Sequence, residues 1–202
     1  MKQVLTLLLI GCAFSCLGQN QLTLNGGPAV PFGQFEKGSI NPESYGLAEP
    51  GYQLGLAYTR KIFKLSFGYS RNPVNKSAYR TGERLKNPNN AIYWDIMARP
   101  YEHLHLMAGP NLAIGGDSSQ IQFNLLLGLY YTQLPSIRSI AIMGSNERFE
   151  KERKSAGSIG FGYNFNIEVG QKISDLTTLK LIVGYYGASQ FFNDVQVSQT
   201  AY

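Results

Sequence analysis

The stretch SIGFGYNFNIEVG, from Ser158 to Gly170, alternates strictly between two kinds of residue. Large apolar or aromatic residues occupy every second position, and glycine, asparagine and glutamate lie between them. Because successive side chains of a β-strand point to opposite faces, this period of two predicts a strand. The alternation lasts twelve residues, from Ser158 to Val169. An ordinary strand has about five or six residues, whereas a tilted strand that crosses a bilayer needs roughly 9–11. The stretch therefore favours a membrane barrel over a soluble one.

The same alternation recurs along the chain, and no later run of 18 apolar residues predicts a helical membrane span. The alternating segments are Leu22–Val30, Tyr52–Thr59, Phe63–Tyr69, Ile92–Ala98, Leu104–Ile114, Ile121–Tyr131, Ile159–Val169 and Leu179–Tyr185. We expect an all-β fold, an antiparallel up-and-down transmembrane β-barrel of 8–10 strands.

The connections between these segments alternate in length. Tight turns are predicted at Arg60–Ile62, Pro100–Glu102 and Ser174–Thr177, and a long loop at Asn72–Asn90. Short turns at one rim and longer loops at the other are typical of outer-membrane barrels, with the turns in the periplasm.

The alternating direction of successive strands also sets the strand count. If the N-terminus lies in the periplasm, one more strand that runs from the periplasm toward the cell surface is needed. Ile137–Met143 is the candidate for this strand, and Glu147–Lys154 then becomes an extracellular loop. Nine strands result, and a tenth is required because an open edge in lipid leaves unpaired backbone groups. Asp194–Tyr202 lacks an apolar band, so we expect the sequence to stop before its closing strand. The alternative is an eight-stranded barrel with Ile137–Met143 in a loop.

The N-terminus has the features of a cleaved secretory signal peptide. Lys2 precedes the apolar run Val4–Ile10, and Cys16-Leu17-Gly18 supplies small residues for cleavage after Gly18. We predict a signal peptide over 1–18 and an outer-membrane barrel domain over 19–202, in a Gram-negative envelope. As an alternative, Leu9-Ile10-Gly11-Cys12 resembles a lipobox that would make Cys12 a lipidated first residue. Both cysteines lie in the predicted signal, so no disulfide or thiol chemistry is expected in the mature chain.

The composition fits a barrel with a lipid-facing band. Charged residues make up only 15% of the chain, below the usual quarter, and aromatic residues make up 12%. The formal net charge of +5 is not arranged as a basic stripe with interleaved aromatic residues, so no nucleic-acid partner is expected.

Three short patterns extend this interpretation to a family. They are GGPAVPFGQF over Gly26–Phe35, AGP over Ala108–Pro110 and GLYYTQLPS over Gly128–Ser136. On these patterns the chain resembles the outer-membrane β-barrel domain family that includes the PorT-like small barrels. The resemblance covers nearly all of the mature chain and implies a fold and a location, but no single activity. Members of that family usually end in a strand with a terminal aromatic residue, and QTAY lacks such a strand.

Inward-facing charged and polar positions form the predicted lumen network. Its members are Lys64, Asp95, Arg99, His105, Glu168 and Lys180. Opposite charges inside a narrow barrel usually pair and fill it, so we expect a plug. The alternatives are a selective, porin-like channel lined by the same groups, and an enzymatic or proton-coupled site.

Neither a metal site nor a catalytic site is expected. His103 and His105 share a strand face, which we place at the periplasmic rim, without further ligands beside them. Ser66, His105 and Glu168 are all expected to face inward, yet nothing in the sequence brings them together and no G-x-S-x-G is present. We therefore predict no enzyme, no cofactor and no catalytic residues.

An aromatic girdle is predicted at the ends of the apolar strand faces, where a bilayer meets water. Its residues are Tyr52, Tyr58, Tyr69, Trp94, Tyr131 and Tyr185.

The first functional hypothesis is a small outer-membrane barrel with a structural or accessory role, in secretion support, adhesion or a narrow channel. Its partners would be outer-membrane lipid and other envelope or secretion proteins. The second is a soluble secreted barrel that binds an apolar ligand inside, and the third is an outer-membrane lipid-modifying enzyme. The face assignment separates the first two, because the rings of Ser158–Gly170 face outward in a membrane and inward around a ligand.

Overall fold

The computed structural model describes residues 20–32, 47–86, 91–116, 118–143, 148–189 and 197–201, so the predicted signal peptide and Cys12 lie outside the described part. Eleven strands and one helix are described. The strands are β1 (Asn20–Ala29), β2 (Gly51–Arg60), β3 (Phe63–Asn72), β4 (Ala91–Ala98), β5 (Tyr101–Gly115), β6 (Ser119–Gln133), β7 (Ile137–Met143), β8 (Arg148–Arg153), β9 (Gly157–Ser174), β10 (Thr177–Ser189) and β11 (Val197–Ala201), and the helix is α2 (Lys76–Lys86).

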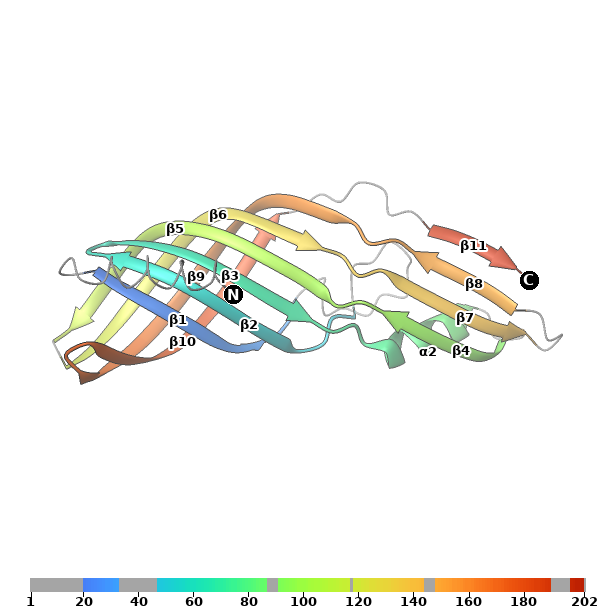
Figure 1. Ribbon diagram of the computed structural model, residues 1–202, viewed down its shortest axis with the longest axis horizontal. Helices are drawn as coiled ribbons and strands as arrows, with labels where there is room; N and C mark the ends of the chain where they lie inside the picture. The colour runs from blue at the N-terminus through green and yellow to red at the C-terminus, as the bar shows by residue number, and fades with distance from the viewer. Residues whose placement is uncertain are drawn as a thin grey trace, which may run out of the picture.

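Seven strands form one curled antiparallel sheet, which we call the half-barrel (Figure 1). Its order is β1-β2-β3-β5-β6-β9-β10, so every neighbour in the sheet is also the next barrel strand in the chain. This confirms the predicted all-β, up-and-down class. In the described residues β1 and β10 each have one strand partner, so the sheet is open between them.

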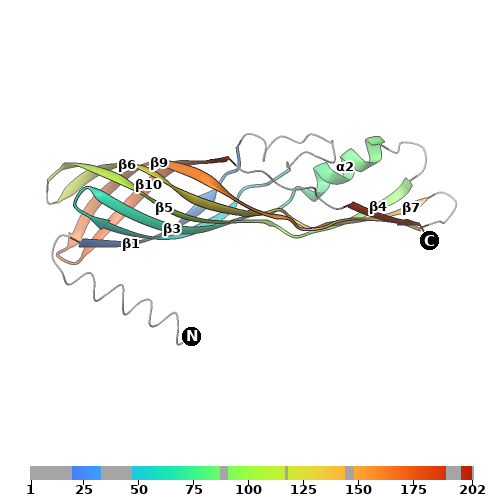
Figure 2. The ribbon, with the colours of Figure 1, turned by 90° about the horizontal axis from the view of Figure 1, so that it is seen from above.

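Four further strands continue the half-barrel beyond one rim, and we call them the extension (Figures 1 and 2). The pairing register runs through the junction without a shift. Ala98 pairs with Ile137 in the extension, and Glu102 pairs with Gln133 in the half-barrel, four residues on in one strand and four back in the other. β4 and β5 are therefore one long strand, and so are β6 and β7.

The junction carries the backbone break that proline imposes. Pro100 and Pro135 lie in it, and neither can donate a ladder hydrogen bond. One backbone hydrogen bond still connects the two strands here, because the Arg99 N–H donates to the Ser136 carbonyl at 3.0 Å. At this level an apolar cluster contains Ile96 and Ile137 from the extension together with residues of the half-barrel and the connecting loops. Those partners are Ala48, Val74, Tyr101 and Leu134, with Tyr79 of α2 packed against them.

The structure corrects several boundaries. The turn predicted at Pro100–Glu102 is wrong, because the strand continues through it. Ile137–Met143 is the continuation of β6 as β7 and not a separate crossing, which contradicts the ten-strand count; in the described residues the half-barrel has seven strands. The loop predicted at Glu147–Lys154 holds β8, and Asp194–Tyr202 holds β11.

The predicted sorting of the connections by length holds at the described ends. The tight turns at Lys61-Ile62 and Asp175-Leu176 lie at one end, the turn rim, where Gly115 and Ser119 also bound a short connection. The end of β1, the start of β2, the helix α2 and the extension lie at the other end, the loop rim. No helix in the described ranges is long and apolar enough to cross a bilayer.

Candidate functional site

The outer face of the half-barrel is covered by large apolar side chains, which we call the apolar belt. Their exposed fractions run from 36% for Leu56 to 76% for Phe161. The belt consists of Leu24, Leu54, Leu56, Phe63, Leu65, Phe67, Leu104, Leu106, Leu112, Ile121, Leu125, Leu127, Leu129, Ile159, Phe161, Phe165, Val169, Leu179, Leu181 and Val183. Monomeric soluble proteins rarely expose contiguous apolar patches larger than a few hundred Å². A belt that follows all seven strands is therefore unusual for a surface in water.

The height of the belt matches the hydrocarbon part of a membrane. On β6 the outward row runs from Ile121 to Tyr131. At about 3.4 Å per residue this row is about 34 Å long, and a tilt of about 40° reduces its height to about 26 Å. Beyond the junction the exposed face carries charge, including Arg138, Arg148 and Glu152. The exposed face of the extension thus mixes charged side chains with the apolar Met97 and Ile142, unlike the apolar belt.

The inner face is polar and buried, and Glu168 is its centre. Both carboxylate oxygens of Glu168 are used: Lys64 Nζ donates to Oε1, and Lys180 Nζ donates to Oε2 at 2.9 Å. The Glu168 and Lys64 residues are only 1% and 2% exposed. A buried carboxylate needs such partners, since an unpaired charge in a low-dielectric interior is strongly destabilising.

Amide side chains extend this cluster in two directions. Lys180 Nζ also donates to Gln122 Oε1 and to Gln21 Oε1, each at 2.9 Å. Asn124 Nδ2 donates to Glu168 Oε1 at 3.1 Å and to Asn166 Oδ1 at 2.6 Å. Asn166 Nδ2 donates in turn to Asn164 Oδ1 at 2.8 Å.

The resulting lumen cluster joins strands from both sides of the half-barrel. Its residues come from β1, β3, β6, β9 and β10, that is, from five of the seven strands. The cluster carries two lysines and one carboxylate, all engaged with partners. Side-chain hydrogen bonds thus link these five strands across the inner face, and the charged groups of the cluster are paired with one another.

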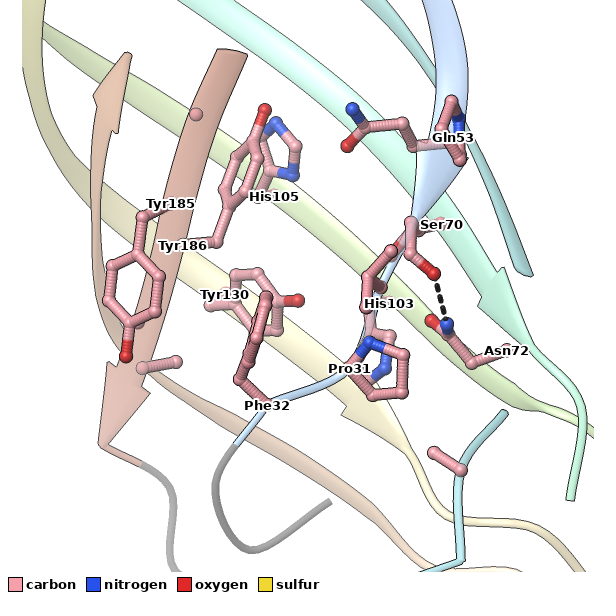
Figure 3. Close-up of a pocket in the computed structure, with 17 residues that line it drawn as sticks. Pro31, Phe32, Gln53, Ser70, Asn72, His103, His105, Tyr130, Tyr185 and Tyr186 are labelled. Carbon is pink, nitrogen blue, oxygen red and sulfur yellow. Dashed lines mark hydrogen bonds between the residues drawn. The ribbon is translucent and has the colours of Figure 1, made fainter. Parts of the chain in front are cut away.

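A cavity of about 180 Å³ lies nearer the loop rim, between the ends of β1 and β10 (Figure 3). Aromatic rings form its floor. The His105 ring stacks on Tyr130 at 6.2 Å between centroids and lies 5.0 Å from Tyr186, while His103 lies 5.6 Å from Tyr130. A hydrogen bond of 3.0 Å also joins His103 Nδ1 and Thr132 Oγ1.

Glycine makes room for this ring stack. A Cβ atom at Gly68 would lie 2.2 Å from the His105 ring, because the two residues face each other across the β3–β5 pair. The ring thus lies directly over the backbone of β3, where any larger residue would displace it.

The structure brings together only part of the predicted lumen network. Lys64, Glu168 and Lys180 meet in the lumen cluster, and His105 lies on the same inner face nearer the loop rim. Asp95 lies on β4 and Arg99 in the junction, so both are outside the half-barrel. The reason is the continuity of β4 and β5, which moves this segment beyond the loop rim. For the same reason His103 and His105 lie toward the loop rim, not at the predicted periplasmic rim.

The predicted girdle tyrosines lie on the outer face. Tyr52 contacts Tyr69 at 6.4 Å between ring centroids, and Tyr185 contacts Tyr163 at 6.1 Å. Tyr58 and Tyr131 are half-buried on the same face, and the side chain of Trp94 lies outside the described residues.

Neither a metal site nor a triad appears in the part of the chain that the structure describes. No group of three or more histidine, cysteine or carboxylate residues is close enough to hold a metal ion. Both oxygens of Glu168 accept hydrogen bonds from Lys64, Lys180 or Asn124, and His105 is not among these donors.

Sequence reasoning missed the amides Gln21, Gln122 and Asn124 as members of the lumen cluster. Each occupies an inward position of an alternating strand, which is a signal that the sequence does carry. Their mutual contacts depend on register: Gln122 pairs with Glu168, and Asn124 with Asn166.

Comparisons with known proteins found no match for this chain. The sequence matches no family model, and no curated protein or solved structure is significantly similar to it.

Proposed function

We propose that this chain is an integral outer-membrane β-barrel protein of small bore, with a filled lumen and a structural or accessory role in the envelope. The observation that carries the proposal is the inverted distribution of side chains. Large apolar residues point outward along the half-barrel, and Lys64, Asn124 and Glu168 are buried inside it. This is the arrangement that lipid outside and a packed polar lumen require.

The competing hypotheses fit the side chains less well. A soluble barrel that binds an apolar ligand needs its rings inside, whereas Phe161 and Phe165 are 76% and 47% exposed. A lipid-modifying enzyme needs an activated nucleophile, and the charged lumen groups are instead paired with one another. A channel needs an open path, and the lumen cluster joins opposite walls.

The sorted rims suggest an orientation and a task. Short turns face the periplasm in outer-membrane barrels, which puts the loop rim and the extension outside the cell. There the exposed, charged face of the extension would be available to envelope, secretion or adhesion partners.

Cell fractionation tests the proposal. Outer-membrane fractions are run on a detergent gel, boiled and unboiled, because a folded membrane barrel migrates differently until it is heated. The expected result is an outer-membrane protein with a heat-dependent shift and no steady conductance in a planar bilayer. A chain that stays in the periplasmic fraction without a shift would contradict it.

A further inference from the structure

The two edges of the half-barrel lie close together without pairing. β1 and β10 are joined by side chains, since Lys180 Nζ donates to Gln21 Oε1 at 2.9 Å. Their described backbones have pairing partners only on the other side, in β2 and β9. We call the gap between these two strands the seam. The two edges are therefore linked by a side-chain contact, with no strand pair between their described backbones.

The directions of the two edges decide what fits between them. β1 begins at Asn20 beside Arg60, and β10 begins at Thr177 after the Asp175 turn, so both run from the turn rim to the loop rim. A direct pair would be parallel, although all other pairs in this sheet are antiparallel. One strand that runs the opposite way would be antiparallel to both edges.

We infer that the seam is the docking site for one further β-strand, antiparallel to β1 and to β10, which completes the barrel. This inference rests on the proposed membrane location, because an open edge in lipid leaves backbone N–H and C=O groups unpaired. The strand spans roughly 9–11 residues, the length that a tilted membrane strand needs. It enters at the loop rim and ends at the turn rim.

The residues that flank the seam indicate which side chains this strand carries. Leu24 and Val183 flank it on the outer face and are 72% and 68% exposed, so its outward side chains are large and apolar. Inward side chains meet the amide of Gln21 near the turn rim, and the rings of Tyr130 and Tyr186 in the 180 Å³ cavity near the loop rim (Figure 3). They are therefore small or amide-bearing, and uncharged because the cavity lining has no charged partner.

A second copy of the chain is a less suitable occupant of the seam than a single antiparallel strand. If two half-barrels stand upright in one membrane, β10 of each meets β1 of the other, and both of these strands run upward. The two joints would be parallel. The observations therefore favour a single antiparallel segment over a dimer.

The test uses the full chain, with Cys12→Ser and Cys16→Ser, folded into phosphatidylcholine vesicles. The probe is a synthetic peptide of about eleven residues that alternates leucine or tyrosine with glycine, serine or asparagine. A peptide of the same composition with scrambled order is the control. Hydrogen exchange is followed for the amides of β1 and β10, with β5 and β6 as internal references.

We expect the alternating peptide to slow exchange in β1 and β10 at least about tenfold and to leave β5 and β6 unchanged, whereas the scrambled peptide has no effect. Edge exchange that the alternating peptide does not change would overturn the inference. Slow exchange in β5 and β6 alone shows that the half-barrel is in the membrane while the seam proposal fails. Fast exchange in all four strands would show that the chain does not insert, which would reject the proposed function and the seam proposal together.

A cysteine pair separates the other occupants of the seam. Leu24→Cys and Val183→Cys lie on the outer face, each three residues beyond the Gln21–Lys180 contact. The inference predicts no direct disulfide, but cross-linking by a longer bifunctional thiol reagent within one chain. A direct intrachain disulfide would show that β1 and β10 pair with each other, and a disulfide-linked dimer would show that a second copy fills the seam. Either result overturns the inference.

Discussion

Glu168 is the residue on which the lumen of the half-barrel depends. Its carboxylate is the shared partner of Lys64 and Lys180, whose side chains are only 3% and 4% exposed. Breaking a buried ion pair on one side is costly, because the remaining charges stay buried without compensation. The stability of this cluster therefore depends on its one acid more than on any single amide.

Glu168→Gln should lower the free energy of unfolding by about 3–5 kcal/mol, because it leaves two buried lysines without a counter-charge. Urea titration of the chain folded in lipid vesicles measures this change. Asp175→Asn is the matched control, since Asp175 lies in an exposed turn and its loss should cost less than about 0.5 kcal/mol. Equal, small effects of the two substitutions would contradict a buried ion cluster. Lys64→Gln added to Glu168→Gln should recover part of the loss.

Glu150 offers a pH-dependent prediction outside the barrel. The Arg138 guanidinium donates a hydrogen bond to this carboxylate and lowers its pKa below the ordinary value, and Arg148 adds a further attraction. A lowered pKa in the folded state stabilises the extension above the ordinary carboxyl pKa, and this stabilisation is lost as the pH falls through the folded value.

A ¹³C NMR titration of the Glu150 carboxylate measures that pKa directly. Arg138→Gln should move the pKa back up toward the ordinary glutamate value, while Arg60→Gln, at the opposite rim, should leave it unchanged. A Glu150 pKa that does not respond to Arg138→Gln would show that the contact is absent in solution.

Inward positions could be predicted from the sequence, but their partners could not. The alternation of Ser158–Gly170 places Asn164, Asn166 and Glu168 on one face, and the structure has them there. Which residues oppose them depends on strand register, which is set by long-range pairing. Lys64 and Glu168 are 104 residues apart in the chain, and no local pattern records that they meet.

Among the elements, the long strands that cross the junction are the main departure from the sequence prediction. The pairs β4–β5, β6–β7 and β8–β9 each run from the turn rim through the half-barrel into the extension, and the pairing keeps the same register on both sides of the junction. The sequence predicts a turn at Pro100–Glu102 because proline disrupts a ladder locally. A local disruption in a long strand and a true turn carry the same signal, and only the pairing partner on the far side distinguishes them.

Helix α2 was missed because its segment is short and polar and lies in a long connection. The signal for it is Asn75, whose Oδ1 accepts a hydrogen bond from the Ala78 N–H at 2.8 Å. An asparagine just before a helical segment is a common N-cap.

A disulfide test distinguishes the long strand from a turn at Pro100. Met97 and Arg138 are directly opposed across the β4–β7 pair. Met97→Cys with Arg138→Cys, in a chain without Cys12 and Cys16, should form a disulfide, since opposed residues lie within the required Cα distance of about 4.4–6.8 Å. Mass spectrometry of the non-reduced protein detects the link.

Met97→Cys with Ile142→Cys is the control, because Ile142 lies on the same face four residues further along β7 and should not be linked. A turn at Pro100 would reverse the result, since residues 97 and 138 would then be apart and no disulfide would form.

At the scale of the whole molecule, the half-barrel has an inverted surface. Its buried residues include Lys64, Asn124, Asn164 and Glu168, while Leu127 and Phe161 are exposed. In water this arrangement would expose apolar area without compensation, whereas in a bilayer the same area faces hydrocarbon. The composition and the alternation predicted this distribution. The chain has few charged residues, and its aromatic residues recur at every second position, so few polar residues are left for an outer face.

The most direct measurement of the central claim compares one substitution at two exposed leucines. Leu127 is 62% exposed near the middle of the apolar belt, and Leu176 is 98% exposed in the turn between β9 and β10. If lipid covers the belt, Leu127→Arg should lower the free energy of unfolding in vesicles by about 2–4 kcal/mol, and Leu176→Arg by less than about 1 kcal/mol. Losses near zero for both variants would mean that water covers both leucines, and would contradict a membrane barrel.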